Sequence, residues 1–98
     1  MLYVGIDAGK TYKCCILESE KKEPSEVFAF NYGMDGFDLF LNQISSYNQP
    51  PENIKVGISE TSLYSLSIAR CVANRGIAPY IFLSTTMERY KKAIPVKI

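Results

Sequence analysis

The hydrophobic positions in the first third of the chain fall in short runs rich in β-formers, separated by polar turn residues. Residues 2–7 alternate poorly between apolar and polar, which is typical of a strand covered on both faces. Residues 8–10 (Ala-Gly-Lys) supply a turn, and residues 11–17 then read as a second strand folding back on the first. A charged loop over residues 18–26 leads to a third strand at residues 27–30. The pattern predicts a β-hairpin extended by one strand.

A helical period follows these strands. Apolar residues recur at i, i+3, i+4 and i+7 and predict one buried stripe, made of Phe37, Phe40, Leu41 and Ile44. Asp35 is the expected N-cap of this helix. Pro50-Pro51 breaks the chain, and a fourth strand is predicted at residues 54–58, ending near residues 59–60.

A second helix is predicted over residues 62–74, with Arg75-Gly76 as its C-terminal stop. Its buried side is expected to carry Leu63, Leu66, Ala69 and Ala73. A fifth strand is predicted at residues 77–83, interrupted near its start by Pro79. The remaining residues read as a weak helix or a tail with four basic residues, Arg89, Lys91, Lys92 and Lys97.

This order of elements predicts an α/β fold. Right-handed crossovers through the two helices make the fourth and fifth strands parallel to the first. We therefore expect one domain over residues 1–98, with a mixed five-stranded sheet in the spatial order 3-2-1-4-5. The third and fifth strands have exposed edges that can pair with another copy of the chain, so a homo-oligomer is one possible assembly.

Composition excludes several classes of function. Eleven Lys and Arg against ten Asp and Glu give a net charge of +1, so binding to nucleic acid or to a membrane needs local patches. Histidine is absent, which excludes Ser-His-Asp and Cys-His nucleophiles, His-ligated zinc and imidazole bases. Carboxylate, amine, hydroxyl and thiol groups remain for chemistry.

The three cysteines indicate a reducing compartment. They are too few for a disulfide framework, and the adjacent Cys14 and Cys15 point to opposite faces of a strand. No apolar run approaches the ~20 residues of a membrane span, and the first residues lack the basic region of a signal peptide. We expect a soluble, cytoplasmic protein with no membrane partner.

Asp7 and Glu60 are the candidate catalytic and metal-binding residues. They end the first and fourth strands, which are parallel neighbours about 4.8 Å apart, at the edge where open sheets form ligand sites. Two carboxylates there can share Mg²⁺ or Mn²⁺, which activates water for attack on phosphate. Capping or structural roles are nevertheless commoner for such a pair, and Glu60 can simply favour the N-terminus of the following helix.

Five further residues are weaker candidates for nucleic-acid binding. Lys10 can reach a phosphate, but an ordinary exposed turn lysine is the simpler interpretation. Tyr64 can stack on a base, although packing on the sheet is more usual. Arg89, Lys91 and Lys92 can follow a nucleic-acid backbone or form a solvated end.

Three stretches read as recognisable motifs. Residues 3–10 are YVGIDAGK, residues 35–41 are DGFDLFL and residues 57–64 are GISETSLY. They are similar to the V-G-I-D-x-x-K, N-T-x-x-G-F-x-x-L-L and G-x-E-x-T-G-x-Y segments of the DEDD transposases, insertion-sequence enzymes with a RuvC-like, ribonuclease-H-like domain. Residues 69–80 continue the match, which covers nearly the whole chain in order.

The resemblance implies that Asp7 and Glu60 are the first two acids of a D-E-D-D tetrad that cleaves and joins DNA strands with Mg²⁺ or Mn²⁺ during transposition. The family's last two acids lie in a K-T-D-x-x-D-like segment, whereas this chain has no Asp after Asp38. We therefore expect a truncated N-terminal part of a larger transposase, or a decayed copy, that is inactive alone. The complete enzyme is expected to add a serine nucleophile and a guide-like RNA partner. Ser62-Leu63 departs from the Thr-Gly of the family motif.

Two other interpretations stay open. Residues 7–11 (DAGKT) partly fit the D-x-G-x-T phosphate-binding turn of the actin, Hsp70 and sugar-kinase superfamily, which shares the sheet and the hairpin. That interpretation predicts nucleotide binding without a response to DNA, but it leaves the motif around Glu60 and the Gly36-Phe37 pair unexplained. The third interpretation is a Holliday-junction resolvase or a catalytically inactive DNA-binding module of the same fold.

Overall fold

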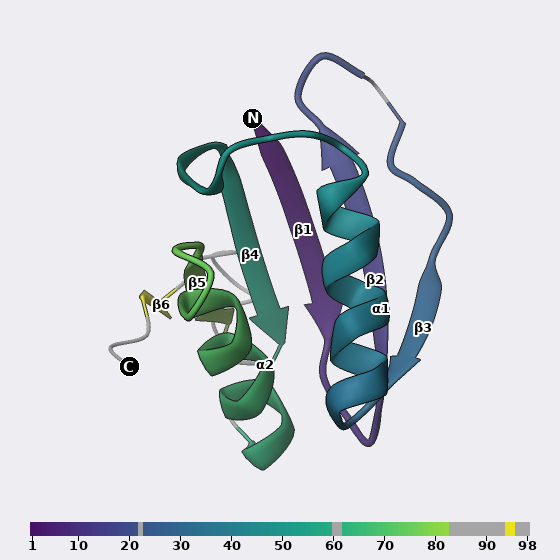
Figure 1. Ribbon diagram of the computed structural model, residues 1–98, viewed down its shortest axis with the longest axis vertical. Helices are drawn as coiled ribbons and strands as arrows, with labels where there is room; N and C mark the ends of the chain where they lie inside the picture. Colours follow the sequence, from purple (N-terminus) through teal and green to yellow (C-terminus); the bar gives the residue numbers. More distant parts are fainter. Residues whose placement is uncertain (22, 60–61, 83–93, 96–98) are drawn as a thin grey trace.

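The strands form one mixed sheet with two helices on one of its faces (Figure 1). The computed structural model describes residues 1–21, 23–59, 62–82 and 94–95. The elements are, in chain order, β1 (Leu2–Asp7), β2 (Thr11–Glu18), β3 (Phe28–Asn31), α1 (Met34–Ser45), the 3-10 helix η1 (Pro51–Asn53), β4 (Ile54–Ser59), α2 (Leu63–Ala73), β5 (Ala78–Phe82) and β6 (Ile94–Pro95).

The order of the strands confirms the predicted topology. Across the described residues it is β3-β2-β1-β4-β5-β6, with β2 antiparallel to β1 and β3, and β4 parallel to β1 and β5. The five predicted strands therefore lie in the order 3-2-1-4-5. The sixth strand, β6, pairs antiparallel with β5 at the sheet edge, and the prediction of a weak helix or tail was wrong for these two residues. A strand this short depends on its neighbour rather than on a sequence period, and an edge tolerates its proline.

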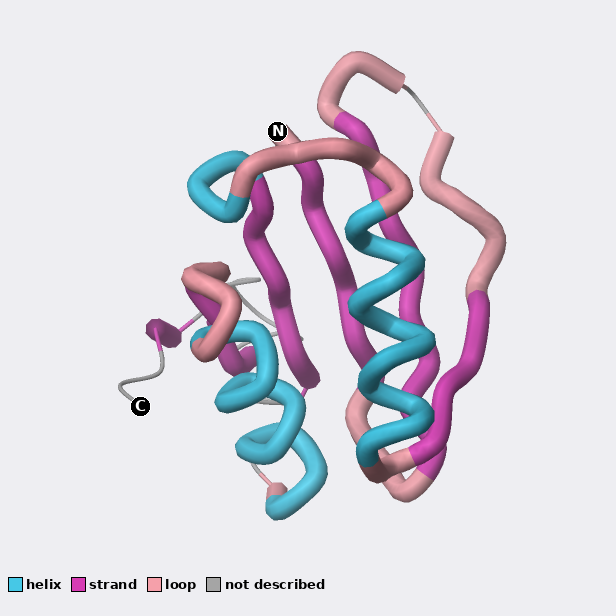
Figure 2. Tube along the Cα trace, in the orientation of Figure 1, coloured by secondary structure: helices cyan, strands magenta, loops and turns pink. Residues whose placement is uncertain are grey.

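Both helices lie against the same face of the sheet (Figure 2). They bury its inward side chains, so the core lies in one layer between sheet and helices. The inward residues of β1, namely Leu2, Val4 and Ile6, are almost fully buried. The ring of Phe30 stacks on both Tyr12 and Phe40, with ring centroids 4.8 Å apart in each pair. Aromatic side chains dominate the energetics of such a core because each removes a large apolar area from water.

Helix α1 buries the predicted stripe but begins earlier than predicted. Phe40 and Ile44 are buried, and Phe37 and Leu41 pack against the core. The N-cap is Gly33 rather than Asp35, because the chain leaves β3 with a φ of 125° at this position, a conformation that favours glycine. Asp35 instead lies in the first turn, where its charge complements the helix dipole.

Helix α2 is rotated relative to the prediction. Its buried residues are Ser65, Ile68, Ala69 and Val72. Leu63 and Leu66, predicted to be buried, have exposed fractions of 69% and 44%. The reason is a capping box in which the side chains of Ser62 and Ser65 each bond to the other residue's backbone N–H, so Ser65 can be buried without losing its hydrogen bonds. The predicted stop is confirmed by the φ of 78° at Gly76.

The second face of the sheet, called here the open face, is not covered by any described helix or strand. Tyr3, Gly5 and Asp7 of β1 are exposed on it, which corrects the prediction that this strand is covered on both faces. Pro79, predicted to interrupt the fifth strand, lies within β5 and is buried. Neither α1 nor α2, the two α-helices in the described part of the chain, has the length and apolar composition needed to cross a membrane.

Candidate functional site

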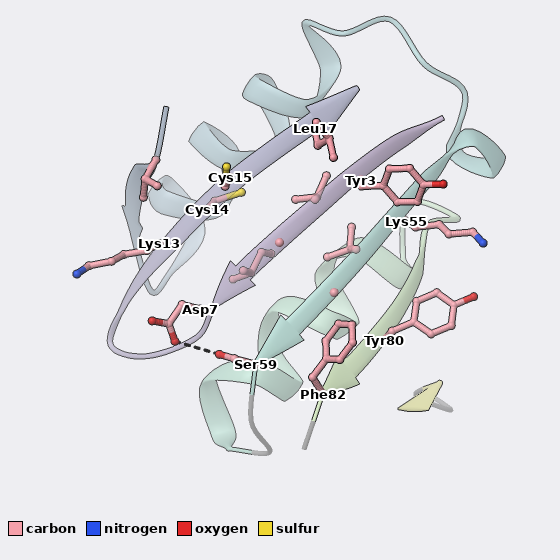
Figure 3. Close-up of a pocket in the computed structure, with 16 residues that line it drawn as sticks. Tyr3, Asp7, Lys13, Cys14, Cys15, Leu17, Lys55, Ser59, Tyr80 and Phe82 are labelled. Carbon is pink, nitrogen blue, oxygen red and sulfur yellow. Dashed lines mark hydrogen bonds between the residues drawn. The ribbon is translucent and has the colours of Figure 1, made fainter. Parts of the chain in front are cut away.

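Asp7 lies at the C-terminal edge of the parallel part of the sheet, as predicted from its position at the end of a strand. It is the last residue of β1, and the parallel pairing of β1 with β4 runs from Leu2 opposite Ile54 to Ile6 opposite Ile58. The next residue on each strand is Asp7 and Ser59, so these two residues meet where both strands end (Figure 3). The carboxylate is exposed.

A serine hydroxyl connects the ends of the two strands. Ser59 Oγ donates a hydrogen bond to Asp7 Oδ1 at 3.0 Å and accepts one from the backbone N–H of Ala8 at 3.0 Å. Hydrogen bonds to a charged acceptor are the stronger ones. The Asp7 carboxylate is thus held by one oxygen, while Oδ2 has no hydrogen-bond donor among the described residues.

Sequence reasoning searched this edge for a second carboxylate and overlooked Ser59. Glu60, Arg89, Lys91 and Lys92 lie outside the described residues. The signal that identifies Ser59 is the strand register, because a one-to-one parallel pairing of Val4-Gly5-Ile6 with Val56-Gly57-Ile58 places it opposite Asp7.

The oxygen donors at this edge fit a hard divalent cation in kind but not in number. Mg²⁺ and Mn²⁺ prefer carboxylate, hydroxyl, carbonyl and water oxygens. Asp7 supplies one carboxylate and Ser59 one hydroxyl, and the described ranges hold no cluster of three or more His, Cys, Asp or Glu residues. The described residues therefore provide one anchoring ligand, and further ligands have to come from water or from other residues.

One lysine lies beside this carboxylate. Lys13 of β2 is the register partner of Asp7 across the antiparallel pair, and its exposed side chain extends away from the carboxylate in Figure 3. The single ion pair within the described residues joins Lys21 and Glu18 instead. Lys13 is therefore a cation near the site that was not predicted from the sequence.

The two weaker candidates within the described residues differ in their surroundings. Lys10 is exposed in the turn between β1 and β2. Tyr64 is partly buried against the core, and its ring packs edge-on against that of Tyr32, with the ring centroids 5.3 Å apart. Its backbone carbonyl also accepts a hydrogen bond from the Tyr12 hydroxyl at 2.7 Å. Tyr64 thus contributes to the packing of α2 on the sheet.

A shallow hollow of about 1000 Å³ extends from Asp7 across the open face (Figure 3). Gly5 and Gly57, two of its lining residues, are direct register partners. Tyr3, Lys55 and Tyr80 line the end far from Asp7. Phe82 lies over Gly57, because a Cβ atom on that glycine would be 2.5 Å from the ring. The site therefore continues into a largely apolar surface.

No protein-family model and no curated protein matches this chain. Among solved structures, the chain is similar to T. thermophilus RuvC in complex with a Holliday junction substrate. The TM-score is 0.64 at 12% sequence identity, over 91% of this chain and 68% of the RuvC chain. At this identity the match shows a shared RuvC-like, ribonuclease-H-like fold, as predicted.

Proposed function

We propose that this chain is the N-terminal part of a DEDD-type transposase or recombinase that cleaves and joins DNA strands with a divalent cation. The observation that carries the proposal is the exposed carboxylate of Asp7 at the end of β1, beside the end of parallel β4, in a RuvC-like fold. Open α/β sheets bind ligands at this edge. DNA is the favoured partner, since RuvC was solved with a Holliday junction.

Asp7 and Glu60 are the proposed ligands of the cation, the latter on the strength of its motif alone. When bound, Mg²⁺ or Mn²⁺ would supply Lewis-acid polarisation of a phosphate and a lowered pKa for the attacking water. Asp7 contributes a negatively charged oxygen, and Ser59 and the Ala8 N–H hold the carboxylate at the strand ends. The motif resemblance extends the proposal to transposition and to a guide-like RNA in the complete protein.

The isolated chain is proposed to bind a cation weakly and not to cut DNA. It contains no Asp after Asp38, so it lacks counterparts of the third and fourth acids of the tetrad. Two carboxylates hold one cation, whereas strand transfer by two metals needs a symmetric clamp on the attacking and leaving oxygens.

A Mn²⁺ titration followed by NMR tests the cation site. Paramagnetic broadening of the Ala8 and Gly9 amide signals is expected, because these residues directly follow Asp7. Asp7→Asn should abolish the broadening, since an amide removes the negative charge that holds a hard cation. Asp38→Asn, which neutralises an exposed carboxylate on α1, should leave it unchanged. Equal broadening in Asp7→Asn, or none in the unaltered chain, would contradict a cation site at Asp7.

DNA and nucleotides separate the proposal from its alternatives. The isolated chain with Mg²⁺ is expected to leave four-way junctions and linear duplexes intact. Robust cutting that is abolished by Asp7→Asn would show that the chain is a complete nuclease. Calorimetric binding of ATP or ADP with no response to DNA would favour the actin-like interpretation instead.

A further inference from the structure

We infer that Ser59 is a positioning residue for Asp7, which holds the carboxylate in one orientation for a divalent cation. The inference rests on the proposed function, because it concerns the same site. It assigns a role to a side chain outside the D-E-D-D set, on the basis of two hydrogen bonds in this structure.

The strand ends explain why a hydroxyl is useful at this position. Strand β1 ends at Asp7, so the N–H of Ala8 has no partner in the strand ladder and needs another acceptor. Ser59 Oγ provides it at 3.0 Å. A serine hydroxyl has one hydrogen and two lone pairs, so Ser59 can accept from Ala8 and still donate to Asp7 Oδ1.

The two bonds act in series on a side chain that is otherwise free to rotate. Asp7 is exposed, and an exposed aspartate samples several staggered rotamers about its Cα–Cβ bond. In this series of hydrogen bonds, from N–H to hydroxyl to carboxylate, each bond polarises the next. The series favours the Asp7 rotamer that keeps both hydrogen bonds. A ligand held in place before the cation arrives loses less conformational entropy on binding.

The same geometry leaves one oxygen for the cation. Ser59 occupies Oδ1, and no described donor reaches Oδ2. Ser59 is half-buried and is the last residue of β4, so strand pairing places its backbone, and the two hydrogen bonds orient its hydroxyl. Groups that orient a metal ligand in this way typically change metal affinity about 10- to 100-fold when removed.

The test compares Ser59→Ala, Ser59→Thr and the distant control Ser46→Ala in the 98-residue chain. Ser46 lies at the C-terminal end of α1, and its hydroxyl bonds only to the carbonyl of Gln43 among the described residues. Three-bond NMR couplings about the Cα–Cβ bond report the Asp7 rotamer without metal. The Mn²⁺ dependence of the Ala8 amide signal reports cation affinity.

Ser59→Ala is expected to average the Asp7 couplings and to weaken Mn²⁺ binding about tenfold. Ser59→Thr, which keeps the hydroxyl on a residue suited to a strand, should restore both towards the unaltered values, and Ser46→Ala should change neither. Unchanged Mn²⁺ affinity in a folded Ser59→Ala variant overturns the inference. Absence of Mn²⁺ binding near Asp7 in the unaltered chain overturns the proposed function, a distinct result, and the couplings then still decide whether Ser59 orients Asp7.

Discussion

Tyr12 and Cys14, two inward-facing residues of β2, make the stability of the fold depend on pH, because each carries a titratable group that is buried. Tyr12 is fully buried and Cys14 has an exposed fraction of 1%. Removal from water raises the pKa of Tyr12 from 10.0 to about 12 and that of Cys14 from 9.0 to about 12. Burial also raises the pKa of Cys71. These groups remain uncharged in the folded chain at pH values where the unfolded chain ionises.

We expect the free energy of unfolding to fall as the pH rises from about 9 towards about 12. Below pH 9 the Cys14 thiol is protonated in both states, so its contribution is complete. Above it, the unfolded thiol ionises while the folded thiol does not, which favours unfolding by about 1.4 kcal/mol per pH unit. Tyr12 adds to the slope above about pH 10. Urea unfolding at about pH 8, 9 and 10 measures the effect.

Cys14→Ala should flatten this pH dependence because it removes the buried thiol. Ile16→Val is the matched control: it also trims a buried side chain of β2, at a cost of about 1 kcal/mol, but adds and removes no titrating group. It should be less stable at every pH with an unchanged slope. Identical slopes for both variants would refute the assignment to Cys14.

At the scale of elements, the contact between α1 and β3 depends on one glycine. Gly36 lies in the first turn of α1, and a Cβ atom there would be 1.8 Å from the backbone oxygen of Asn31. Backbone cannot move aside as the end of a flexible side chain can. The Gly-Phe pair that resembles the transposase motif thus has a physical reason, namely the close approach of helix and strand.

Gly36→Ala is expected to destabilise the fold by about 3 kcal/mol or more, or to prevent folding, because helix and strand have to separate. Gly9→Ala is the matched control in the turn after β1, where the added Cβ would meet Thr11 at an ordinary 3.4 Å. Its effect should stay within about 1 kcal/mol. Thermal and urea unfolding compare the two, and a Gly36→Ala variant as stable as Gly9→Ala would contradict the contact.

The elements also show what sequence reasoning can reach. Turn residues and β-formers located the five main strands to within a residue or two, and the crossover rule gave their order. The rotation of α2 was missed because Leu63 and Leu66 look like core residues, whereas the capping box buries Ser65. Ser59 was missed because the search was for charge, and the hydrogen bond that selects it exists only once β1 and β4 are in register.

At the scale of the whole molecule, the described residues form two layers, one sheet and one layer of helices, where three layers are usual. Strands β1, β4 and β5 are parallel, and parallel strands are normally covered on both faces. Here the described helices cover only one face, and Tyr3, which lies on the other face next to Lys55, is exposed by 44%. Among the described residues nothing covers this apolar surface, which is the kind of surface that packs against further chain or against a second copy.

We therefore expect the isolated chain to self-associate through the open face, with a weight-average mass that rises with concentration in sedimentation velocity. Tyr3→Lys should suppress the association, because it places a second ammonium group next to Lys55, and burying both in an interface adds like-charge repulsion to the cost of desolvation. Leu63→Lys places the same side chain on α2, where Leu63 is exposed by 69% on the helix side of the sheet, and should associate like the unaltered chain. If only Leu63→Lys suppressed self-association, the contact would lie on the helices. A chain that stays monomeric at every concentration would show that an exposed apolar sheet face is insufficient for self-association. The comparison tests the two sides of one sheet separately, because both variants introduce the same lysine side chain.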